Sequence, residues 1–430
     1  MLSPALTASI FSAVEMAPRD PILGITEAFA ADTNPKKVNL GVGVYYDENG
    51  KLPLLRCVQA AEKAMADDPK ARGYLPIDGI AAYDAVVKAL VFGADSEPVK
   101  SGRIATVQGV GGTGALKVGA DFLKKLNPHA KVLISDPSWE NHRALFSNAG
   151  FMVESHPYFD PTANGGLGGI NFAGMLAAFN AAPAGTIVVL HACCHNPTGY
   201  DISSVQWDAV ISVVKARGLV PFLDMAYQGF GYGLKEDGVA VQKFVDAGLT
   251  FFVSTSFSKS FSLYGERVGA LSVLCQSSDE AARILSQLKI VIRTNYSTPP
   301  THGGAVVAAV MTDPKLRAMW EEELGEMEPE PGGVASFVLG RKMRVVIDLG
   351  IDQAQRDEPP VHGVIALLLH LPHPLAGHPG EGTDRVEVEV DVRVHAPTLG
   401  QYRKHVRDRP SEVGSTGARS IRARVGSGRR

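Results

Sequence analysis

The feature that most constrains the fold is a regular alternation of short apolar runs and amphipathic stretches between about residues 100 and 275. The apolar runs predict strands at 104–108, 131–136, 151–158, 186–193, 219–224, 251–256 and 268–274, with amphipathic helices between most of them. Strands that alternate with helices favour an α/β fold, with a mostly parallel central sheet sandwiched by helices. Such sheets bind ligands at the carboxyl ends of their strands, so we expect the chemistry at that edge.

Composition argues against several classes of function. The chain has 430 residues, which suggests two or three domains of about 150 residues. Its net charge of −3 gives no reason to expect nucleic acid or a charged membrane surface as partner. No apolar run reaches the roughly 18 residues that span a bilayer, and we expect no signal or transit peptide. Four cysteines, two of them adjacent, predict reduced, mostly buried thiols in a cytoplasmic protein rather than a structural disulfide bridge.

A glycine-rich turn, Gly109–Gly114, joins a predicted strand to a predicted helix. Small residues let backbone N–H groups and the start of a helix approach an anionic group, and Thr113 adds a hydroxyl. The turn therefore predicts a phosphate site, or else a tight turn that packs the helix on the strand. It also matches the dinucleotide fingerprint G-x-G-x-x-G, with Asp136 roughly where a ribose-binding acid should lie. A nicotinamide-dependent oxidoreductase is therefore the rival hypothesis.

A lysine, Lys259, follows directly on the predicted strand 251–256 and is surrounded by hydroxyl side chains. A lysine must lose its proton to form a Schiff base with an aldehyde, and burial or a nearby cation lowers its pKa. Arg267 offers such a cation and a second phosphate ligand. The alternative is an ordinary surface lysine.

An acid, Asp224, ends the predicted strand 219–224, where burial is costly unless the carboxylate is paired. Pyridoxal phosphate needs a carboxylate beside its pyridinium nitrogen to keep that nitrogen protonated. The alternative is an acid that caps a turn or a helix.

A polar turn rich in His and Cys, His191–Gly199, follows the predicted strand 186–193. Adjacent cysteines lack the usual spacing of zinc ligands, so we predict no metal site. A turn in which Asn196 hydrogen-bonds a ligand fits these residues better.

Taken together, these segments resemble the aspartate/aromatic amino acid aminotransferases, a fold-type I family that depends on pyridoxal phosphate. The resemblance runs from about Pro21 to Met327. Its most specific motifs, in family order, are Asn39–Tyr45, Gly73–Gly79, Gly111–Leu116, Asp136–Trp139, Cys194–Gly199, Asp224–Gly229, Ser256–Lys259 and Asn295–Ser297. This set also decides against the nicotinamide rival, because the glycines match the pyridoxal phosphate cradle.

The resemblance implies ping-pong transfer of an amino group between an amino acid, aspartate or aromatic, and a 2-oxo acid such as 2-oxoglutarate. It implies that Lys259 binds the cofactor covalently and shuttles a proton between substrate and cofactor. Asp224 would pair with the ring nitrogen. Tyr227 and Asn196 would hydrogen-bond the phenolic oxygen, and Trp139 would stack on the ring.

The resemblance also implies how phosphate, substrate and partner subunit are bound. The phosphate would be held by Gly112, Thr113, Ser256 and Arg267, with Ser258 close by. Tyr74 would reach the phosphate of a neighbouring subunit, which implies a homodimer. Arg293 would pair with a dicarboxylate in the partner's site, and Gly43, Trp139 and Asn196 would line the path of the substrate.

The character of the chain changes near Met327. Up to that residue the chain has 17 Lys and 10 Arg, and beyond it 2 Lys and 13 Arg. The family's C-terminal part should complete a small domain and supply an arginine for the substrate α-carboxylate. That segment is not recognisable, and neither Arg393 nor Arg419 takes the role. We hypothesise a reading-frame shift at about residue 327, because GC-rich codons yield Arg, Pro and His in a wrong frame.

These observations predict three segments. Residues 1–50 would form an N-terminal arm and part of an incomplete small domain, 51–327 the cofactor-binding large domain, and 328–430 an unmatched, poorly ordered segment. A genuine divergent C-terminal domain is the alternative to a frameshift. Alternating charged residues and valines at 385–395 predict one exposed strand, or are a compositional accident. The alternative function is a catalytically impaired remnant without the arginine for the substrate carboxylate.

Overall fold

The computed structural model describes residues 51–327 except residue 167, the short stretches 9, 11–16, 29–34 and 43–46, and three strands beyond residue 366. The chain divides into two units. One is Val44–Asp348, and the other combines Met1–Gly43 with Leu349–Arg430. The boundaries at residues 50 and 327 that the sequence suggests stay predictions.

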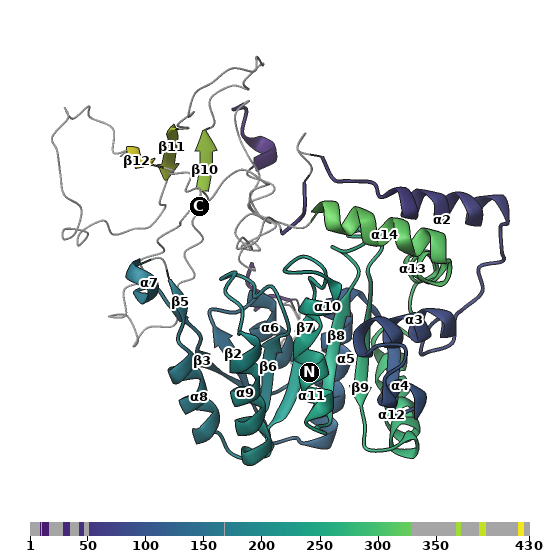
Figure 1. Cartoon of the computed structure of the whole chain (residues 1–430), viewed down its shortest axis with the longest axis horizontal. Coiled ribbons are helices and arrows are strands. Elements are labelled where there is room, and N and C mark those ends of the chain that lie inside the picture. Colours follow the sequence, from purple (N-terminus) through teal and green to yellow (C-terminus); the bar gives the residue numbers. More distant parts are fainter. Residues whose placement is uncertain are drawn as a thin grey trace, which may run out of the picture. The chain divides into compact units, whose positions relative to one another are not determined.

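A seven-stranded sheet forms the centre of the larger unit, in the order β1-β9-β8-β7-β6-β2-β3 (Figure 1). Its strands are β1 (Ile104–Val110), β2 (Lys131–Asp136), β3 (Met152–Pro157), β6 (Ile187–His191), β7 (Val220–Met225), β8 (Phe251–Ser256) and β9 (Val268–Leu274). β9 runs antiparallel to both of its neighbours, and the remaining neighbours pair in parallel. The predicted mostly parallel sheet is therefore confirmed. β4 (Phe159–Asp160) and β5 (Gly169–Ile170) form a separate antiparallel pair.

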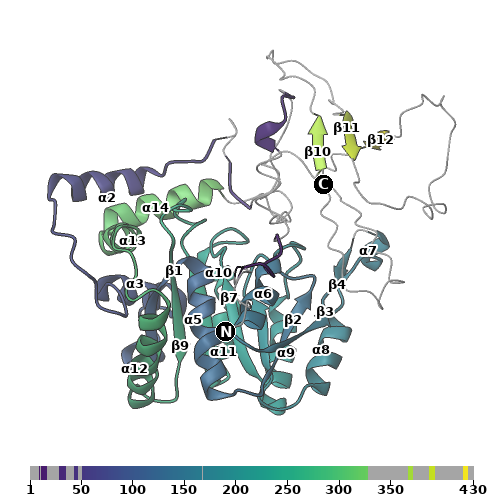
Figure 2. The ribbon, with the colours of Figure 1, turned by 180° about the vertical axis from the view of Figure 1, so that it is seen from behind.

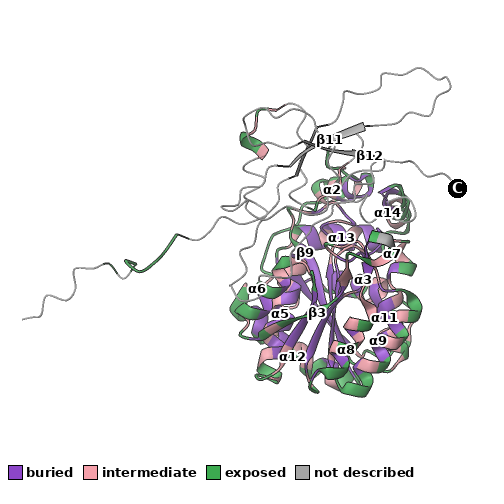
Figure 3. Cartoon of the chain, turned by 90° about the vertical axis from the view of Figure 1, so that its left-hand side faces the viewer, coloured by how far each residue is buried: buried purple, intermediate pink, exposed green. Residues whose placement is uncertain are grey.

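Helices cover both faces of this sheet (Figure 3), where the buried strands lie between outer helix faces that are exposed. Because both faces are covered, the central strands are buried along almost their whole length, and every residue of β9 is buried. The layer that contains α5 (Gly111–Leu126) is turned toward the viewer in Figure 2. The other helices of the unit are α2 (Arg56–Asp67), α3 (Ala81–Phe92), α4 (Glu97–Lys100), α6 (Glu140–Asn148), α7 (Ala163–Gly166), α8 (Phe172–Ala181), α9 (Ser204–Arg217), α10 (Leu234–Asp237), α11 (Val239–Asp246), α12 (Ser278–Asn295), α13 (His302–Thr312) and α14 (Pro314–Met327). No helix in the described part of the chain is long and apolar enough to cross a membrane.

Local sequence explains where these helices start and stop. α9 begins with a capping box, in which Ser203 and Gln206 bond each other's backbone N–H groups, and it ends at Gly218 in the left-handed conformation. α2 follows Leu55, which has no side-chain acceptor to cap it. Glu323 of α14 takes this role, because its carboxylate accepts the N–H groups of Arg56 at 2.6 Å and Cys57 at 3.0 Å. α14 thereby fixes the start of α2.

The smaller unit contains an antiparallel sheet of β10 (Leu367–His370), β11 (Glu387–Val392) and β12 (Ser420–Arg424), in that order. β11 lies within the stretch 385–395, so the strand predicted from its alternating valines is confirmed. β12 lies in a segment for which the sequence predicts little order. Its pairing with β11 is a long-range contact that the local sequence does not reveal. The rest of 328–430 lies outside the described residues.

Candidate active site

Parallel strands bring distant segments of the chain to one edge of the sheet, because their carboxyl ends all lie there. The residues predicted for the site follow these strand ends: Gly112 and Thr113 after β1, Trp139 after β2, Asn196 after β6, Asp224 and Tyr227 at the end of β7, Ser256, Ser258 and Lys259 at the end of β8, and Arg267 directly before β9. The expectation of chemistry at this edge therefore agrees with where the structure places these residues.

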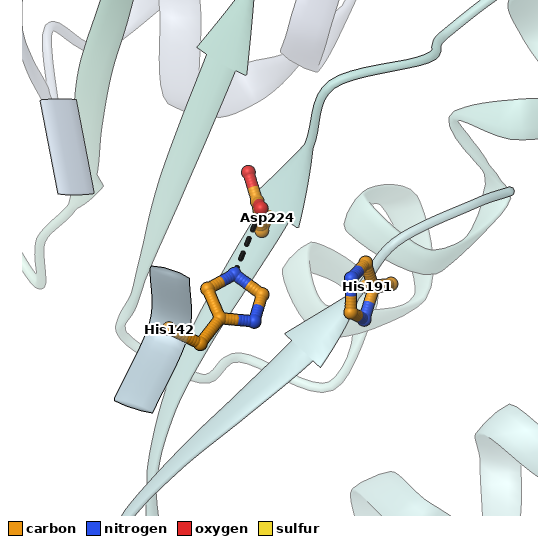
Figure 4. A group of neighbouring side chains, drawn as sticks. All are labelled: His142, His191 and Asp224. Carbon is orange, nitrogen blue, oxygen red and sulfur yellow. Dashed lines mark hydrogen bonds and ion pairs between the residues drawn. The ribbon is translucent and has the colours of Figure 1, made fainter. Parts of the chain in front are cut away.

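Asp224 is the buried acid of the site and is only 6% exposed. Its Oδ2 accepts a hydrogen bond from His142 Nε2 at 3.0 Å, which Figure 4 shows as a dashed line. Ser138 Oγ lies 2.9 Å from the other ring nitrogen of His142 and orients the imidazole. The His191 ring lies on the other side, with its centroid 5.0 Å from that of His142. Asp224 is therefore held in one orientation, and no described residue hydrogen-bonds its Oδ1.

The surroundings keep Asp224 ionised. Burial acts to raise the pKa of its carboxyl. The hydrogen bond from His142 and the electrostatic interactions with His142, His191 and Lys259 outweigh burial, so the pKa lies below its ordinary value. Burial and the nearby His142 lower the pKa of His191 to about 3, although Asp224 opposes this. His191 is therefore neutral near pH 7, and its buried Nε2 has no hydrogen-bond partner among the described residues.

Lys259 lies at the end of β8, partly buried, with its Nζ 5.1 Å from the centre of the Tyr227 ring. Burial lowers the pKa of its ammonium group, Asp224 opposes this, and Arg267 adds to the lowering. The net result is a pKa below the ordinary value, so the neutral amine is more accessible than in an exposed lysine. The hypothesis of an ordinary surface lysine does not fit this environment.

A small cationic cluster, made by Arg267 with Ser258 and Gly111, lies beside Lys259. The guanidinium of Arg267 donates to Ser258 Oγ at 3.3 Å and to the Tyr264 carbonyl at 3.0 Å. Gly111 N–H donates to the Arg267 carbonyl at 2.9 Å, which joins the start of α5 to the start of β9. Gly111 has φ +68°, and a Cβ there would lie 2.4 Å from Arg267 Nη2. Only glycine leaves the guanidinium this position.

The start of α5 adjoins this cationic cluster. The helix begins at Gly111 rather than near Gly114, so the predicted glycine turn forms its first turn. The N–H groups of a first helical turn have no partner within the helix and favour an anion. Ser254 Oγ donates to the Gly112 carbonyl at 3.3 Å, and a Cβ on Gly112 would lie 3.2 Å from Ser256 Cβ. Helix start, hydroxyl groups and guanidinium together suit a phosphate group.

The turn after β6 is organised around His195. His195 is 2% exposed and lies 2.9 Å from both Ser135 Oγ and Thr198 Oγ1. Tyr158 stacks on its ring at 3.9 Å. This network positions the neighbouring Asn196, which is partly buried. All four cysteines are free and buried.

His142, His191 and Asp224 also form a possible metal site, because their ligand atoms lie within 4.8 Å of one another. Two observations weigh against this chemistry. Oδ2 of Asp224 is already bonded to His142 Nε2. The neighbouring charges, on Lys259 and Arg267, are positive and would repel a metal ion.

Some predicted residues are not joined to this cluster. Tyr74 is 97% exposed. Arg293 lies exposed in the last turn of α12 and donates to Ser297 Oγ. No hydrogen bond or ion pair among the described residues connects either of them to Lys259 or Asp224. Gly43 belongs to the other unit of the chain, so its place at the site stays a prediction.

Sequence reasoning missed His142, which contacts Asp224 directly. A signal was present: His142 lies three residues after Trp139, just beyond the recognised motif Asp136–Trp139. The two rings meet in a T-shaped contact, with centroids 5.3 Å apart.

Comparisons with known proteins agree with this geometry. The model of the family described as Aminotransferase class I and II matches residues 35–328. An aspartate aminotransferase of Pseudomonas aeruginosa is 61% identical over 349 residues, which is 81% of this chain and 85% of that protein. An aromatic-amino-acid aminotransferase of Escherichia coli is 50% identical over 74% of this chain and 79% of its own length.

Solved structures give the same result. An aromatic-amino-acid aminotransferase from Burkholderia pseudomallei, covalently bound to pyridoxal phosphate, is 67% identical with a TM-score of 0.72, over 74% of this chain and 79% of that one. The predicted fold-type I architecture is thereby confirmed. The comparisons give no support to a catalytically impaired remnant. On this evidence, the chain belongs to the class I and II aminotransferase family.

Proposed function

We propose that this chain transfers an amino group between an amino acid, aspartate or aromatic, and a 2-oxo acid such as 2-oxoglutarate, with pyridoxal phosphate as cofactor. The observation that carries the proposal is the partly buried amine of Lys259, 5.1 Å from the centre of the Tyr227 ring, whose pKa is lowered by burial and by Arg267 although Asp224 opposes this. The aspartate and aromatic aminotransferases among the relatives support both substrate classes.

The residues at the carboxyl edge of the sheet fit this cofactor. The first turn of α5, with Gly112 and Thr113, would hold the phosphate together with Arg267 and the hydroxyls of Ser256 and Ser258. The space that glycine leaves beside the guanidinium at the start of this helix is consistent with that role. The open Oδ1 of Asp224 suits a protonated ring nitrogen.

When bound, pyridoxal phosphate supplies an aldehyde for the amine and a protonated ring that draws electron density from the substrate. Lys259 Nζ would bind it covalently, and would take a proton from the substrate Cα and return it to the cofactor. Asp224, kept ionised by His142, would hold the proton on the ring nitrogen. Burial raises the pKa of the Tyr227 hydroxyl, which therefore keeps its proton. The Tyr227 hydroxyl and the Asn196 side-chain amide would each donate a hydrogen bond to the phenolic oxygen of the cofactor.

We further propose a homodimer, located in the cytoplasm. The exposed Tyr74 is free to reach the phosphate of a neighbouring subunit, and the exposed Arg293 would meet the side chain of a dicarboxylate in the partner's site. Trp139 would stack on the cofactor ring, and Gly43 would border the substrate. Four free, buried cysteines are consistent with a reducing compartment.

Borohydride reduction tests the cofactor assignment. The full-length chain is incubated with pyridoxal phosphate, reduced, digested and mapped by mass spectrometry. We expect a reduced pyridoxyl adduct at Lys259, and none at that position in Lys259→Arg, which keeps the positive charge but cannot form the Schiff base. A folded wild-type chain with no adduct at Lys259 would refute the proposal.

Substrate class is tested separately, with a panel of amino donors and 2-oxoglutarate as acceptor. We expect turnover with aspartate and with at least one aromatic amino acid, and loss of that turnover in Lys259→Arg. Turnover only with an unrelated donor would contradict the proposed substrates while leaving the cofactor assignment intact.

A further inference from the structure

A buried tryptophan on α14 contacts the turn that contains Lys259, and the proposed function does not yet use it. Trp320 is 0% exposed, and its Nε1–H donates to the carbonyl oxygen of Ser260 at 2.7 Å. Ser260 directly follows Lys259 and is itself only 6% exposed. A buried carbonyl that lost this donor would have to forgo a hydrogen bond that water cannot replace.

The ring of Trp320 also packs against the same turn. It stacks on Phe261, with ring centroids 4.8 Å apart and planes inclined by 23°. Phe261 in turn meets Phe257 edge to face at 5.5 Å. Phe257 and Phe261 lie two residues before and two residues after Lys259. Buried aromatic rings therefore flank the lysine on both sides along the chain.

The turn belongs to no helix or strand, and bonds to the start of β9 hold its beginning: Phe257 N–H donates to the Val268 carbonyl at 3.1 Å, and Arg267 donates to Ser258 Oγ at 3.3 Å. Within it, Ser262 N–H donates to the Lys259 carbonyl at 2.9 Å, and Phe261 N–H donates to the Phe257 carbonyl at 3.3 Å. Among the described residues, the Ser260 carbonyl is bonded by a side chain from outside the turn, that of Trp320. Trp320 thus fixes the Ser260–Phe261 peptide unit, one residue beyond the lysine.

We propose that Trp320 is a positioning residue for Lys259, holding the lysine turn through the hydrogen bond to Ser260 and the stack on Phe261. This inference rests on the proposed function, since it concerns the direction from which the amine meets the cofactor aldehyde. It predicts that α14, although distant from Lys259 in the sequence, sets the rate at which the amine is presented.

The test compares two buried tryptophans. Trp320→Phe keeps an aromatic ring on Phe261 but removes the N–H donor. Trp207→Phe is the matched control. Trp207 lies in α9, is 2% exposed and packs edge to face on Phe244, with ring centroids 6.0 Å apart. Apo protein is mixed with pyridoxal phosphate and quenched with borohydride at increasing times, and the adduct at Lys259 is quantified. The pH midpoint of the visible absorbance change of the bound cofactor is measured in parallel.

We expect both variants to melt at a lower temperature than wild type. We expect only Trp320→Phe to slow adduct formation, by about fivefold to tenfold for one lost hydrogen bond, and to shift the pH midpoint by about half a unit. If Trp320→Phe cannot be recovered folded, Phe261→Leu carries the same test, because it removes the stack and leaves the donor. We expect it to change both readouts in the same direction.

Adduct kinetics and a pH midpoint equal to those of Trp207→Phe would overturn the positioning role, since a purely structural residue affects only melting. A wild-type chain that forms no adduct would overturn the proposed function itself, and with it the positioning role. The two failures are therefore distinguishable by the behaviour of the wild-type protein.

Discussion

Replacing Gly111 with alanine tests whether the cationic cluster at the start of α5 binds the cofactor phosphate. The new Cβ would lie 2.4 Å from Arg267 Nη2 and 2.9 Å from its Cζ. The guanidinium is the end of a flexible side chain, so it can move away and the fold survives. Its bonds to Ser258 Oγ and the Tyr264 carbonyl, at 3.3 and 3.0 Å, would then be lost.

The magnitude has two parts. The left-handed φ of +68° costs alanine about 1–2 kcal/mol of folding stability. Loss of a charge-assisted bond to phosphate costs about 1.5–3 kcal/mol, which raises the dissociation constant about tenfold to hundredfold. Gly248→Ala is the control, because its φ is +69° and no atom lies within 4 Å of the added Cβ. It experiences the backbone strain without the steric contact.

The assay combines urea unfolding of the apo proteins with a titration of pyridoxal phosphate followed by visible absorbance. We expect both variants to lose similar stability, and only Gly111→Ala to bind the cofactor more weakly. Equal affinities of Gly111→Ala and Gly248→Ala for pyridoxal phosphate would refute the proposal that this cationic cluster binds the phosphate.

Three further predictions follow from other parts of the chain. Glu323→Gln should lower the free energy of unfolding at pH 7 by about 1–3 kcal/mol in urea titrations, because the carboxylate bonds the N–H groups of Arg56 and Cys57. Burial would raise the pKa of Glu323, but these bonds hold it below the ordinary value, so the stabilisation is present above about pH 4.3 and the deficit of the variant should shrink as the pH falls below it. Phe222→Ala should cost about 3–5 kcal/mol in the same assay, since the ring is 0% exposed; a loss under about 1 kcal/mol would contradict the packing. Translation of the coding DNA beyond Met327 in its other two frames should restore helical periodicity and a Ser-Gly-Arg-like segment, and failure in both frames would rule out the frameshift hypothesis.

The fold of the larger unit was largely predictable because hydrophobic periodicity marks buried strands directly. The strand predicted at 131–136 is β2, and that predicted at 251–256 is β8. Boundaries of helices were less predictable. The start of α5 at Gly111, within the predicted glycine turn, was not predictable, because glycines disfavour a helix locally and tertiary contacts from Arg267 and Ser254 hold this turn.

For the site, the sequence identified the residues that end strands, because topology alone brings strand ends together. Lys259, Asp224 and Tyr227 are of this kind. Two residues that contact the site or its lysine turn from within helices, His142 of α6 and Trp320 of α14, were not identified. His142 and Trp320 look like ordinary positions of amphipathic helices, and only the packing of those helices shows which way each side chain points.

The direction of β9 determines whether Arg267 can belong to the cationic cluster at the start of α5. β9 pairs Val268 with Val110 of β1 and Gly269 with Ser256 of β8. If this seven-residue strand ran parallel to its neighbours, its first residue would lie at the opposite edge of the sheet, about 20 Å from its present position. The antiparallel direction of β9 thus places the guanidinium of Arg267 at the edge of the sheet where β1 and β8 end. A circularly permuted chain in which β9 ran parallel to them would be expected to lose the proposed phosphate site, although it would contain the same residues.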